Sequence, residues 1–468
     1  MQIHYPYGLM NTLAVDISNG VEALYRASSP RLAQVHFFET DYGLHTLVAD
    51  GSQVYAVTPE LWQEIESATQ QNPELINSLL AQYGLTTQSF MTGAPLESPP
   101  LRALSLAVAQ KCNLGCTYCY AQEGSFGGTA KSMTWDVAKA AVKRLFEEAQ
   151  AGERVNLSFM GGEPLVNRDL IQSATQLAVE LAQAKGAKVG FGITTNGTLL
   201  TPDDGDFFER YGFAVTVSLD GVGATHDRLR PFKSGHGSYD RIVANLKPLL
   251  SQQRRMQVSA RVTVTPQNLN LRETLEQLIE MGFHSVGFSP MLSSPTGRAQ
   301  METADLDIML EQMIDCGREF ERQTIAGQRY PFSNLTLAMQ QIHRGTHRPY
   351  PCGAGAGYMG VSADGNLSAC HRFVDDEAGL MGDLNNGLDR QRQNQWLADR
   401  QVDRQEPCKS CWARYLCGGG CHHEVIHRGR PACDYIRGWL HFCLQTYIHL
   451  LEQRPDFFVP VNSTPNSV

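Results

Sequence analysis

Three closely spaced cysteines, Cys112, Cys116 and Cys119, lie within the segment KCNLGCTYCY. A zinc site or an ordinary cubane cluster uses four protein ligands, so such a trio either takes a fourth ligand from elsewhere or leaves one metal position open. The same i, i+4, i+7 spacing is also that of an apolar helix stripe, which would make the cysteines core residues. The elements around the trio decide between these interpretations.

Composition sets the class of protein. The chain has 468 residues, of which 42% are hydrophobic and 19% charged, which is typical of a globular protein with large cores. No segment approaches the length of a membrane span, and no basic stretch leads into an apolar run at the start. The net charge of −9 disfavours nucleic acid and anionic membranes as partners. We therefore expect a soluble cytoplasmic protein, in which twelve cysteines serve as metal ligands rather than as disulfides.

The first part of the chain, residues 1–92, predicts a small α+β domain. Its segment VHFFETDYGLHTLVADGSQVYAV contains short strands that break at the turn Asp50-Gly51. A helix is expected to begin at Thr58-Pro59-Glu60. Residues 93–100, within TGAPLESPP, have the glycine and paired prolines of a linker.

Residues 101–330 alternate between apolar runs and amphipathic helical segments. Such strand–helix units form a parallel sheet covered by helices, and right-handed crossovers curl it toward a barrel. We therefore predict an α/β fold with a partial (βα)6 TIM-like barrel. Its expected strands are RALSLAV, VNLSFM, KVGFGITTN, FAVTVSL, VSARVTV and SVGFSPM.

The predicted strand ends carry residues suited to chemistry. Active sites of such barrels lie at the C-terminal ends of the strands, and the cysteine trio follows the first strand directly. The second strand runs into MGGEP, in which Gly161 and Gly162 allow close backbone approach and Glu163 offers a carboxylate to an ammonium group.

The third and fourth strands end in TTNGT and SLDG. Asn196, Ser218 and Asp220 at these ends are suited to hydrogen-bonding a ribose or a carboxylate, although Asn-Gly and Asp-Gly are also strong turn signals. Arg230, slightly further along, is either a guanidinium for a carboxylate or a member of a surface ion pair.

CNLGCTYCY, FMGGEP, TTNGT and VSLDG, in this order, resemble the radical S-adenosylmethionine (SAM) enzymes. The resemblance implies that the trio holds a [4Fe-4S] cluster whose fourth iron is chelated by the amino and carboxylate groups of SAM. It also implies that Tyr118 lies near the adenine and that Gly161, Gly162 and Glu163 receive the methionine ammonium. Asn196, Ser218 and Arg230 would contact the ribose and carboxylate ends.

A second cysteine set occupies residues 331–450. CKSCWARYLCGGGC reads CxxCxxxxxCxxxC, and such paired cysteines are also compatible with a zinc ribbon. The order from Cys352 through Gly365 and Cys370 to this segment and a final cysteine resembles the SPASM domain, which carries auxiliary iron–sulfur clusters. Residues 451–468 are expected to be a flexible tail.

The SPASM resemblance implies a division of these cysteines between two auxiliary [4Fe-4S] clusters, which makes three clusters in all. The first would take Cys352, Cys370 and Cys421, and the second Cys408, Cys411, Cys417 and Cys433. Cys443 either closes the first cluster or is a core thiol. Cys316 lies on a helical pattern typical of a core residue.

These resemblances imply an enzyme that cleaves SAM reductively to a 5'-deoxyadenosyl radical, supplied with electrons by a reducing partner. A leading α+β domain followed by radical SAM and SPASM domains resembles the maturases that grip a precursor peptide as an added strand. The alternative for this domain is a structural cap. The length and CYAQEGSFGGTAKSM resemble the maturases of quinohemoprotein amine dehydrogenase, which form thioethers from cysteine to Asp or Glu carbons of a small subunit.

Several alternatives to this function stay open. They are a sactipeptide- or ranthipeptide-type maturase, a sulfatase-maturing enzyme, and a non-enzymatic iron–sulfur or zinc scaffold. Sulfatase-maturing enzymes have their trio near the N-terminus, whereas a domain precedes it here. A scaffold leaves GGEP and the open trio unexplained. The sequence names no catalytic base.

Overall fold

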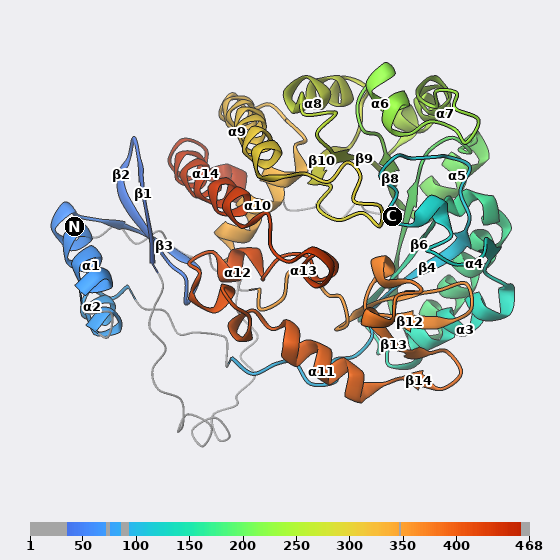
Figure 1. The fold of residues 1–468 in the computed structure, drawn as a ribbon, viewed down its shortest axis with the longest axis horizontal. Helices are drawn as coiled ribbons and strands as arrows, with labels where there is room; N and C mark the ends of the chain where they lie inside the picture. Colours follow the sequence, from blue (N-terminus) through green and yellow to red (C-terminus); the bar gives the residue numbers. More distant parts are fainter. Residues whose placement is uncertain (1–34, 72–74, 86–92, 346–347, 460–468) are drawn as a thin grey trace.

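A computed structural model describes residues 35–71, 75–85, 93–345 and 348–459 (Figure 1). The N-terminal unit contains an antiparallel sheet in the order β1-β2-β3, made of Val35–Thr40, Gly43–Val48 and Gln53–Val57. Two helices follow, α1 (Pro59–Gln71) and α2 (Ile76–Gln82). Val48, Tyr55, Ile65 and Leu80 belong to a core of its own. The expected small α+β unit is therefore present in the described residues.

The central unit is the predicted partial barrel. Six parallel strands lie in the order β10-β9-β8-β7-β6-β4. In chain order they are β4 (Ala103–Gln110), β6 (Arg154–Gly161), β7 (Lys188–Thr195), β8 (Ala214–Ser218), β9 (Gln257–Val264) and β10 (Ser285–Pro290). The short β5 (Lys131–Ser132) pairs antiparallel with β4. The α/β barrel predicted from the alternating pattern is confirmed.

Helices cover the outer face of this sheet (Figure 1). They are α3 (Trp135–Glu147), α4 (Arg168–Lys185), α5 (Pro202–Tyr211), α6 (Ala224–Leu229), α7 (Tyr239–Gln252) and α8 (Leu271–Glu280). Local signals set their ends. Thr201 and Asp204 form a capping box at the start of α5, and α4 ends at Gly186 in the left-handed conformation.

The C-terminal part continues the barrel sheet. Strand β11 (Tyr358–Val361) pairs parallel with β4, and β12 (Asn366–Ser368), β13 (Leu380–Asp383) and β14 (Gly387–Leu388) extend the sheet from there. The helices are α9 (Thr303–Ile325), α10 (Ser333–His343), α11 (Arg390–Arg400), α12 (Arg414–Cys417), α13 (His422–Arg428) and α14 (Cys433–Gln453). The cysteine-rich region is therefore anchored on the edge of the barrel.

Part of the stretch expected to be a tail is packed. Helix α14 continues to Gln453, and Pro455–Phe458 form a 3-10 helix whose Phe458 ring stacks on His343 with centroids 4.5 Å apart. The rest of the expected tail, residues 460–468, lies outside the described residues. Residues 1–34, in which we expect no targeting segment, also lie outside them.

The N-terminal unit contacts the cysteine-rich region. His36 of β1 stacks on Trp412 with ring centroids 3.7 Å apart, and its Nε2 lies 2.9 Å from Nδ1 of His441. Arg414, whose side chain is fully buried, donates to Asp50 at 2.7 Å. These contacts hold the first sheet against the region that follows the barrel.

Among the helices of the described residues, none combines the length and the apolar character needed to cross a membrane.

Candidate functional site

The trio lies in the loop that follows β4. Leu114 N donates to Cys112 Sγ at 3.4 Å, and Arg230 Nη1 lies 3.8 Å from Cys116 Sγ. Burial raises the pKa of the Cys116 thiol to about 12, with Arg230 lowering it and the thiols of Cys119 and Cys112 raising it further. The three sulfurs therefore share one site, and all three residues are partly exposed. The interpretation of Cys112, Cys116 and Cys119 as fully buried core residues is therefore wrong.

Glycines let the trio loop approach the second strand end. A Cβ on Gly162 would lie 2.4 Å from Lys111 O, and one on Gly161 would lie 2.2 Å from Ala109 O. A Cβ on Gly124, in the extension after the trio, would lie 2.8 Å from Gly162 Cα. Backbone atoms cannot yield at such distances, so these positions require glycine.

The Glu163 carboxylate, which the resemblance assigns to the methionine ammonium, is bonded to the loops around it in this structure. Its side chain is fully buried and accepts hydrogen bonds from Leu165 N at 3.0 Å, Thr195 Oγ1 at 2.8 Å and Asn196 N at 2.7 Å. Burial raises the pKa of Glu163 to about 7, against the lowering effect of these hydrogen bonds. The carboxylate therefore connects the loops after β6 and β7, and its contact with an ammonium group stays a prediction.

Asn196 and Ser218 differ in how fully they are engaged. Asn196 Nδ2 donates to Asn113 Oδ1 at 3.0 Å and lies 3.7 Å from Cys112 Sγ, while its Oδ1 accepts two bonds from Thr198. It therefore supports the trio loop. Within the described residues, the partly buried hydroxyl of Ser218 has no hydrogen-bond partner, so it is available to a ligand.

Asp220, which directly follows the fourth strand end, has no role implied by the family resemblance. It is fully buried, and its Oδ2 accepts from the hydroxyl of Tyr118 and from Arg230 Nε at 2.7 Å. Its Oδ1 accepts from Thr263 N at 2.8 Å, and Arg230 lies over the Tyr118 ring at 5.5 Å. Arg230 is therefore in a buried ion pair rather than in the surface pair considered from the sequence. The sequence signal for Asp220 is the SLDG turn at this strand end.

The structure brings Cys352, Cys370 and Cys421 together from distant parts of the chain. Burial raises the pKa of Cys370 to about 12, and the neighbouring Cys421 and Cys352 add to this rise. Arg372 Nη1 lies 3.7 Å from Cys421 Sγ and 2.7 Å from Glu424 Oε1.

Tyr120 connects this group to the trio. Burial raises the pKa of Tyr120, and Cys119 and Cys370 both add to the rise, so the phenol lies near a cysteine of each group. The guanidinium of Arg372 lies 5.5 Å from the centre of the Tyr120 ring. Arg372 was not predicted, and CHRFVDD gives no signal for it.

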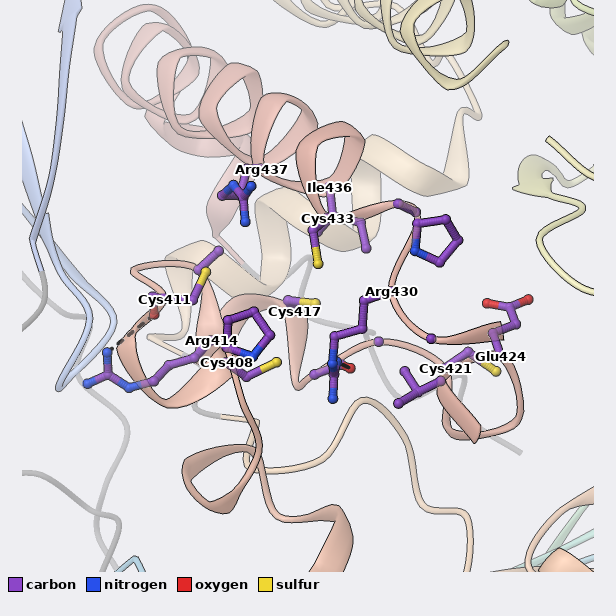
Figure 2. A pocket seen from close by; sticks show the side chains of 18 of the residues that line it. Cys408, Cys411, Arg414, Cys417, Cys421, Glu424, Arg430, Cys433, Ile436 and Arg437 are labelled. Atoms are coloured by element: carbon purple, nitrogen blue, oxygen red, sulfur yellow. Dashed lines mark hydrogen bonds between the residues drawn. The ribbon is translucent and has the colours of Figure 1, made fainter. Parts of the chain in front are cut away.

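The second auxiliary group is equally well formed. Burial raises the pKa of Cys408 to about 11, and Cys417, Cys433 and Cys411 contribute to the rise. Figure 2 shows these four sulfurs around a pocket that also reaches Cys421 and Glu424. Cys417 at the end of α12 and Cys433 at the start of α14 thus face one space with Cys408 and Cys411, which lie in the segment before α12.

Cys443 lies apart from both groups. It is fully buried in α14, and burial alone raises the pKa of its thiol, with no contribution from another cysteine. It lies ten residues beyond Cys433 on the same helix, which corresponds to about 15 Å along the axis. The structure therefore does not bring Cys443 to the first auxiliary group. Cys316 is buried in the core, as its helical pattern predicted.

The donor sets fit iron–sulfur clusters. Closely grouped cysteine thiolates are the ligands of [4Fe-4S] clusters, and the trio leaves one position for a further ligand. Glycine-lined backbone and the free Ser218 hydroxyl lie at the neighbouring strand ends of the described barrel. The barrel, the trio and these strand ends are consistent with a SAM site.

Comparisons with known proteins agree with this geometry. Residues 106–278 match the Radical SAM superfamily. The chain is 25% identical over 347 residues to the cysteine-type anaerobic sulfatase-maturating enzyme of Clostridium novyi, covering 69% of this chain and 89% of that enzyme. It is 24% identical over 366 residues to the serine-type enzyme of Klebsiella aerogenes, covering 75% and 88%.

A solved structure has the same fold. That of native anSMEcpe with bound AdoMet superposes with a TM-score of 0.61 at 19% identity, covering 75% of this chain and 98% of that one. Residues 106–278 thus match the Radical SAM superfamily, and the chain is similar to anaerobic sulfatase-maturating enzymes over 69% and 75% of its length.

Proposed function

We propose that this protein is a radical SAM enzyme, and that it is a peptide maturase that forms intrapeptide thioethers between a cysteine sulfur and an Asp or Glu carbon. The substrate would be a cysteine-containing precursor such as the small subunit of quinohemoprotein amine dehydrogenase. With SAM and its cluster bound, the chemistry supplied is a 5'-deoxyadenosyl radical that abstracts hydrogen from an unactivated carbon.

The observation that carries the proposal is the arrangement of the cysteines. Two further sulfur groups lie beyond the trio, and the first is joined to it through Tyr120 and Arg372. Thioether formation removes two hydrogen atoms from the peptide, so an electron must leave the substrate after the first hydrogen is abstracted. A neighbouring auxiliary cluster is a suitable acceptor.

The residues of the chain have distinct tasks in this proposal. Cys112, Cys116 and Cys119 would hold the SAM cluster, and the backbone of Gly161 and Gly162 would receive the ammonium group of SAM. Ser218 would bind the ribose or carboxylate end, while Asp220 fixes Tyr118 and Arg230 around it. Cys352, Cys370 and Cys421 would hold the first auxiliary cluster and Cys408, Cys411, Cys417 and Cys433 the second.

The N-terminal unit is proposed to bind the precursor. Strand β3 is an edge of the three-stranded sheet in the described residues, and an extended peptide can pair with such an edge. A relative supports the peptide as substrate class, since a solved structure of anSMEcpe contains both AdoMet and the Kp18Cys peptide. That chain aligns with this one at 20% identity and a TM-score of 0.62.

A second candidate is maturation of a sulfatase, because the curated relatives bear that function. Two assays separate the candidates. The reconstituted enzyme, given dithionite and SAM without oxygen, is incubated with the small-subunit precursor or with a cysteine-containing sulfatase peptide, and 5'-deoxyadenosine and peptide mass are followed.

Loss of a pair of hydrogen atoms per cross-link in the precursor supports the proposal. The variant Cys352→Ala should still cleave SAM without forming product, because the electron acceptor is lost. Modification of the sulfatase peptide alone would favour the second candidate, and full product formation by Cys352→Ala would refute the role of the first auxiliary group.

A further inference from the structure

Arg261 lies on the inner face of the barrel. Along β9, the side chains of Val258, Ala260, Val262 and Val264 are buried in the core shared with the outer helices. Successive side chains of a strand point to opposite faces, so Arg261 points to the interior of the barrel. Its register neighbours are Ser218 on β8 and Gly287 on β10. The charged side chain of Arg261 therefore faces the lumen of the barrel.

The guanidinium of Arg261 has no carboxylate partner within the described residues. Its one hydrogen bond to another side chain runs from Nη2 to Ser289 Oγ at 2.6 Å. Glu424 is close enough to affect its pKa, but the Glu424 carboxylate already pairs with Arg372 at 2.7 Å. Two guanidinium groups thus share one carboxylate, which leaves one positive charge in excess.

Arg261 does not serve as a counter-ion to the cysteines. Arg230, Arg372 and Arg437 each have a cysteine among the groups that shift their pKa, namely Cys116, Cys421 and Cys411. For Arg261 the contributing charged groups are Glu424 and Arg372, with no cysteine among them. The positive charge of Arg261 is therefore available to an anion that is not a cysteine-bound cluster.

Arg261 is both exposed to solvent and surrounded by protein. The residue is exposed to solvent, yet protein atoms crowd its guanidinium enough for burial to lower its pKa. Both conditions hold for a side chain that lines an enclosed space reached by water. Arginine stays charged in such a place, and its planar fork suits bidentate binding of a carboxylate.

The position of Arg261 relates to both reacting centres. Its carbonyl accepts from Leu219 N at 3.0 Å, and the strand is held to Asp220 through Thr263 N, so Arg261 is fixed beside the expected SAM contacts. On its other side are Arg372 and Glu424, which adjoin Cys421 of the first auxiliary group. Arg261 therefore lies near both the strand end of β8 and the residues that adjoin the first auxiliary group.

We propose that Arg261 is a substrate-binding residue that pairs with the carboxylate of an acidic side chain in the peptide. This rests on the proposed function, and it identifies Arg261 as the residue that selects an Asp or Glu beside the carbon that reacts. The other source of a carboxylate in this space is SAM, so the test separates the two.

Because the peptide substrate is not identified, the experiment selects binding peptides from a library. A displayed library with one fixed cysteine and randomised flanking positions is bound to the reconstituted holoenzyme with saturating SAM, and enriched sequences are counted. The wild type should enrich Asp and Glu over Asn and Gln by about tenfold or more, as for hydrogen bonds to charged groups. Arg261→Gln should lose this preference. Arg261→Lys should retain part of it, and Arg241→Gln, on the exposed face of α7, should retain all of it.

The dissociation constant of SAM is measured in parallel. It should change less than about twofold in Arg261→Gln if the carboxylate belongs to the peptide. A SAM affinity lowered about tenfold with an unchanged acidic preference would assign Arg261 to SAM and overturn the proposal. Absence of acidic enrichment by the wild type would also overturn it, and this readout requires no variant to fold.

The result is independent of the thioether assay. Acidic enrichment without cross-linking of the small-subunit precursor would leave the carboxylate site standing while the proposed reaction fails. Cross-linking of the precursor with equal enrichment of acidic and amide side chains would support the proposed reaction and overturn the carboxylate site at Arg261.

Discussion

The guanidinium of Arg230 lies 2.7 Å from Oδ2 of Asp220, the same oxygen that accepts the hydroxyl proton of Tyr118. The Asp220 side chain is fully buried and that of Arg230 is 12% exposed, so the pair is withdrawn from water. Because Arg230 also lies 3.8 Å from Cys116 Sγ, this ion pair connects the strand end of β8 to the trio. A single carboxylate thus sets the positions of two residues expected around SAM.

Replacing this carboxylate should be costly. Asp220→Asn leaves the charge of Arg230 buried without its partner, which typically costs about 3–5 kcal/mol. We expect this loss in denaturant unfolding of the anaerobic holoprotein, together with reduced 5'-deoxyadenosine formation. Tyr118→Phe is the control, because it removes one hydrogen bond and keeps the ion pair. Unfolding of Asp220→Asn at the wild-type midpoint would contradict this role.

The separation of Cys443 from the auxiliary groups predicts that it is dispensable for iron. Cys443→Val keeps a small apolar side chain in the core of α14, so iron and sulfide should remain at the wild-type level, about twelve irons per chain for three clusters. Cys421→Ala, by contrast, should lower the iron content. A loss of about four irons in Cys443→Val would show that Cys443 is a ligand after all.

Close backbone approach makes Gly162 intolerant of any side chain. Gly162→Ala places Cβ 2.4 Å from Lys111 O, so the loops after β4 and β6 must separate. We expect SAM binding and cleavage to fall at least about tenfold, measured by equilibrium dialysis and deoxyadenosine release. Gly115→Ala in the trio loop is the matched control, since its Cβ would have Lys233 Cα at 3.7 Å, an ordinary contact. Equal losses in both variants would argue against the steric explanation.

Acid should weaken the attachment of the N-terminal unit. Burial lowers the pKa of His36 from 6.5 to about 4, and His441 lowers it further, so the docked form keeps this imidazole neutral. The unfolded or undocked form binds the proton more readily, so the stabilisation is complete above pH 6.5 and is lost as the pH falls toward 4.

The fluorescence of Trp412, on which His36 stacks, reports this change when compared with a variant that lacks Trp412. His36→Phe keeps the ring contact and removes the titration, so its signal should be flat across this window. An identical pH profile in the wild type and in His36→Phe would locate the titrating group elsewhere.

The sequence predicted the fold well where local pattern determines it. The six barrel strands follow from their alternating neighbours, and the caps at Thr201 and Gly186 follow from residue type. Strand β11 was not predicted, because Tyr358–Val361 is short and its pairing with β4 joins segments about 250 residues apart. Such pairing depends on the tertiary fold rather than on local propensity.

The site was predictable in its residue types and less so in its contacts. The trio and both auxiliary groups were identified by motif resemblance, and the structure gathers the cysteines of each set. The direction of the Glu163 side chain was not predictable, because it depends on Thr195 and Asn196 of another strand end. Arg261 carried a signal that was overlooked, a lone charge in the middle of the apolar segment VSARVTV.

The hydrogen-bonded pairing of β4 with β11 joins the trio and the first auxiliary group through one continuous sheet. Gln110 at the end of β4 strengthens this junction, because its side chain accepts from Ala363 N at 2.8 Å and donates to Asp375 at 2.6 Å. The sheet and these side-chain bonds therefore set the distance between the two cysteine groups, and we expect a peptide substrate to span that distance through its own flexibility.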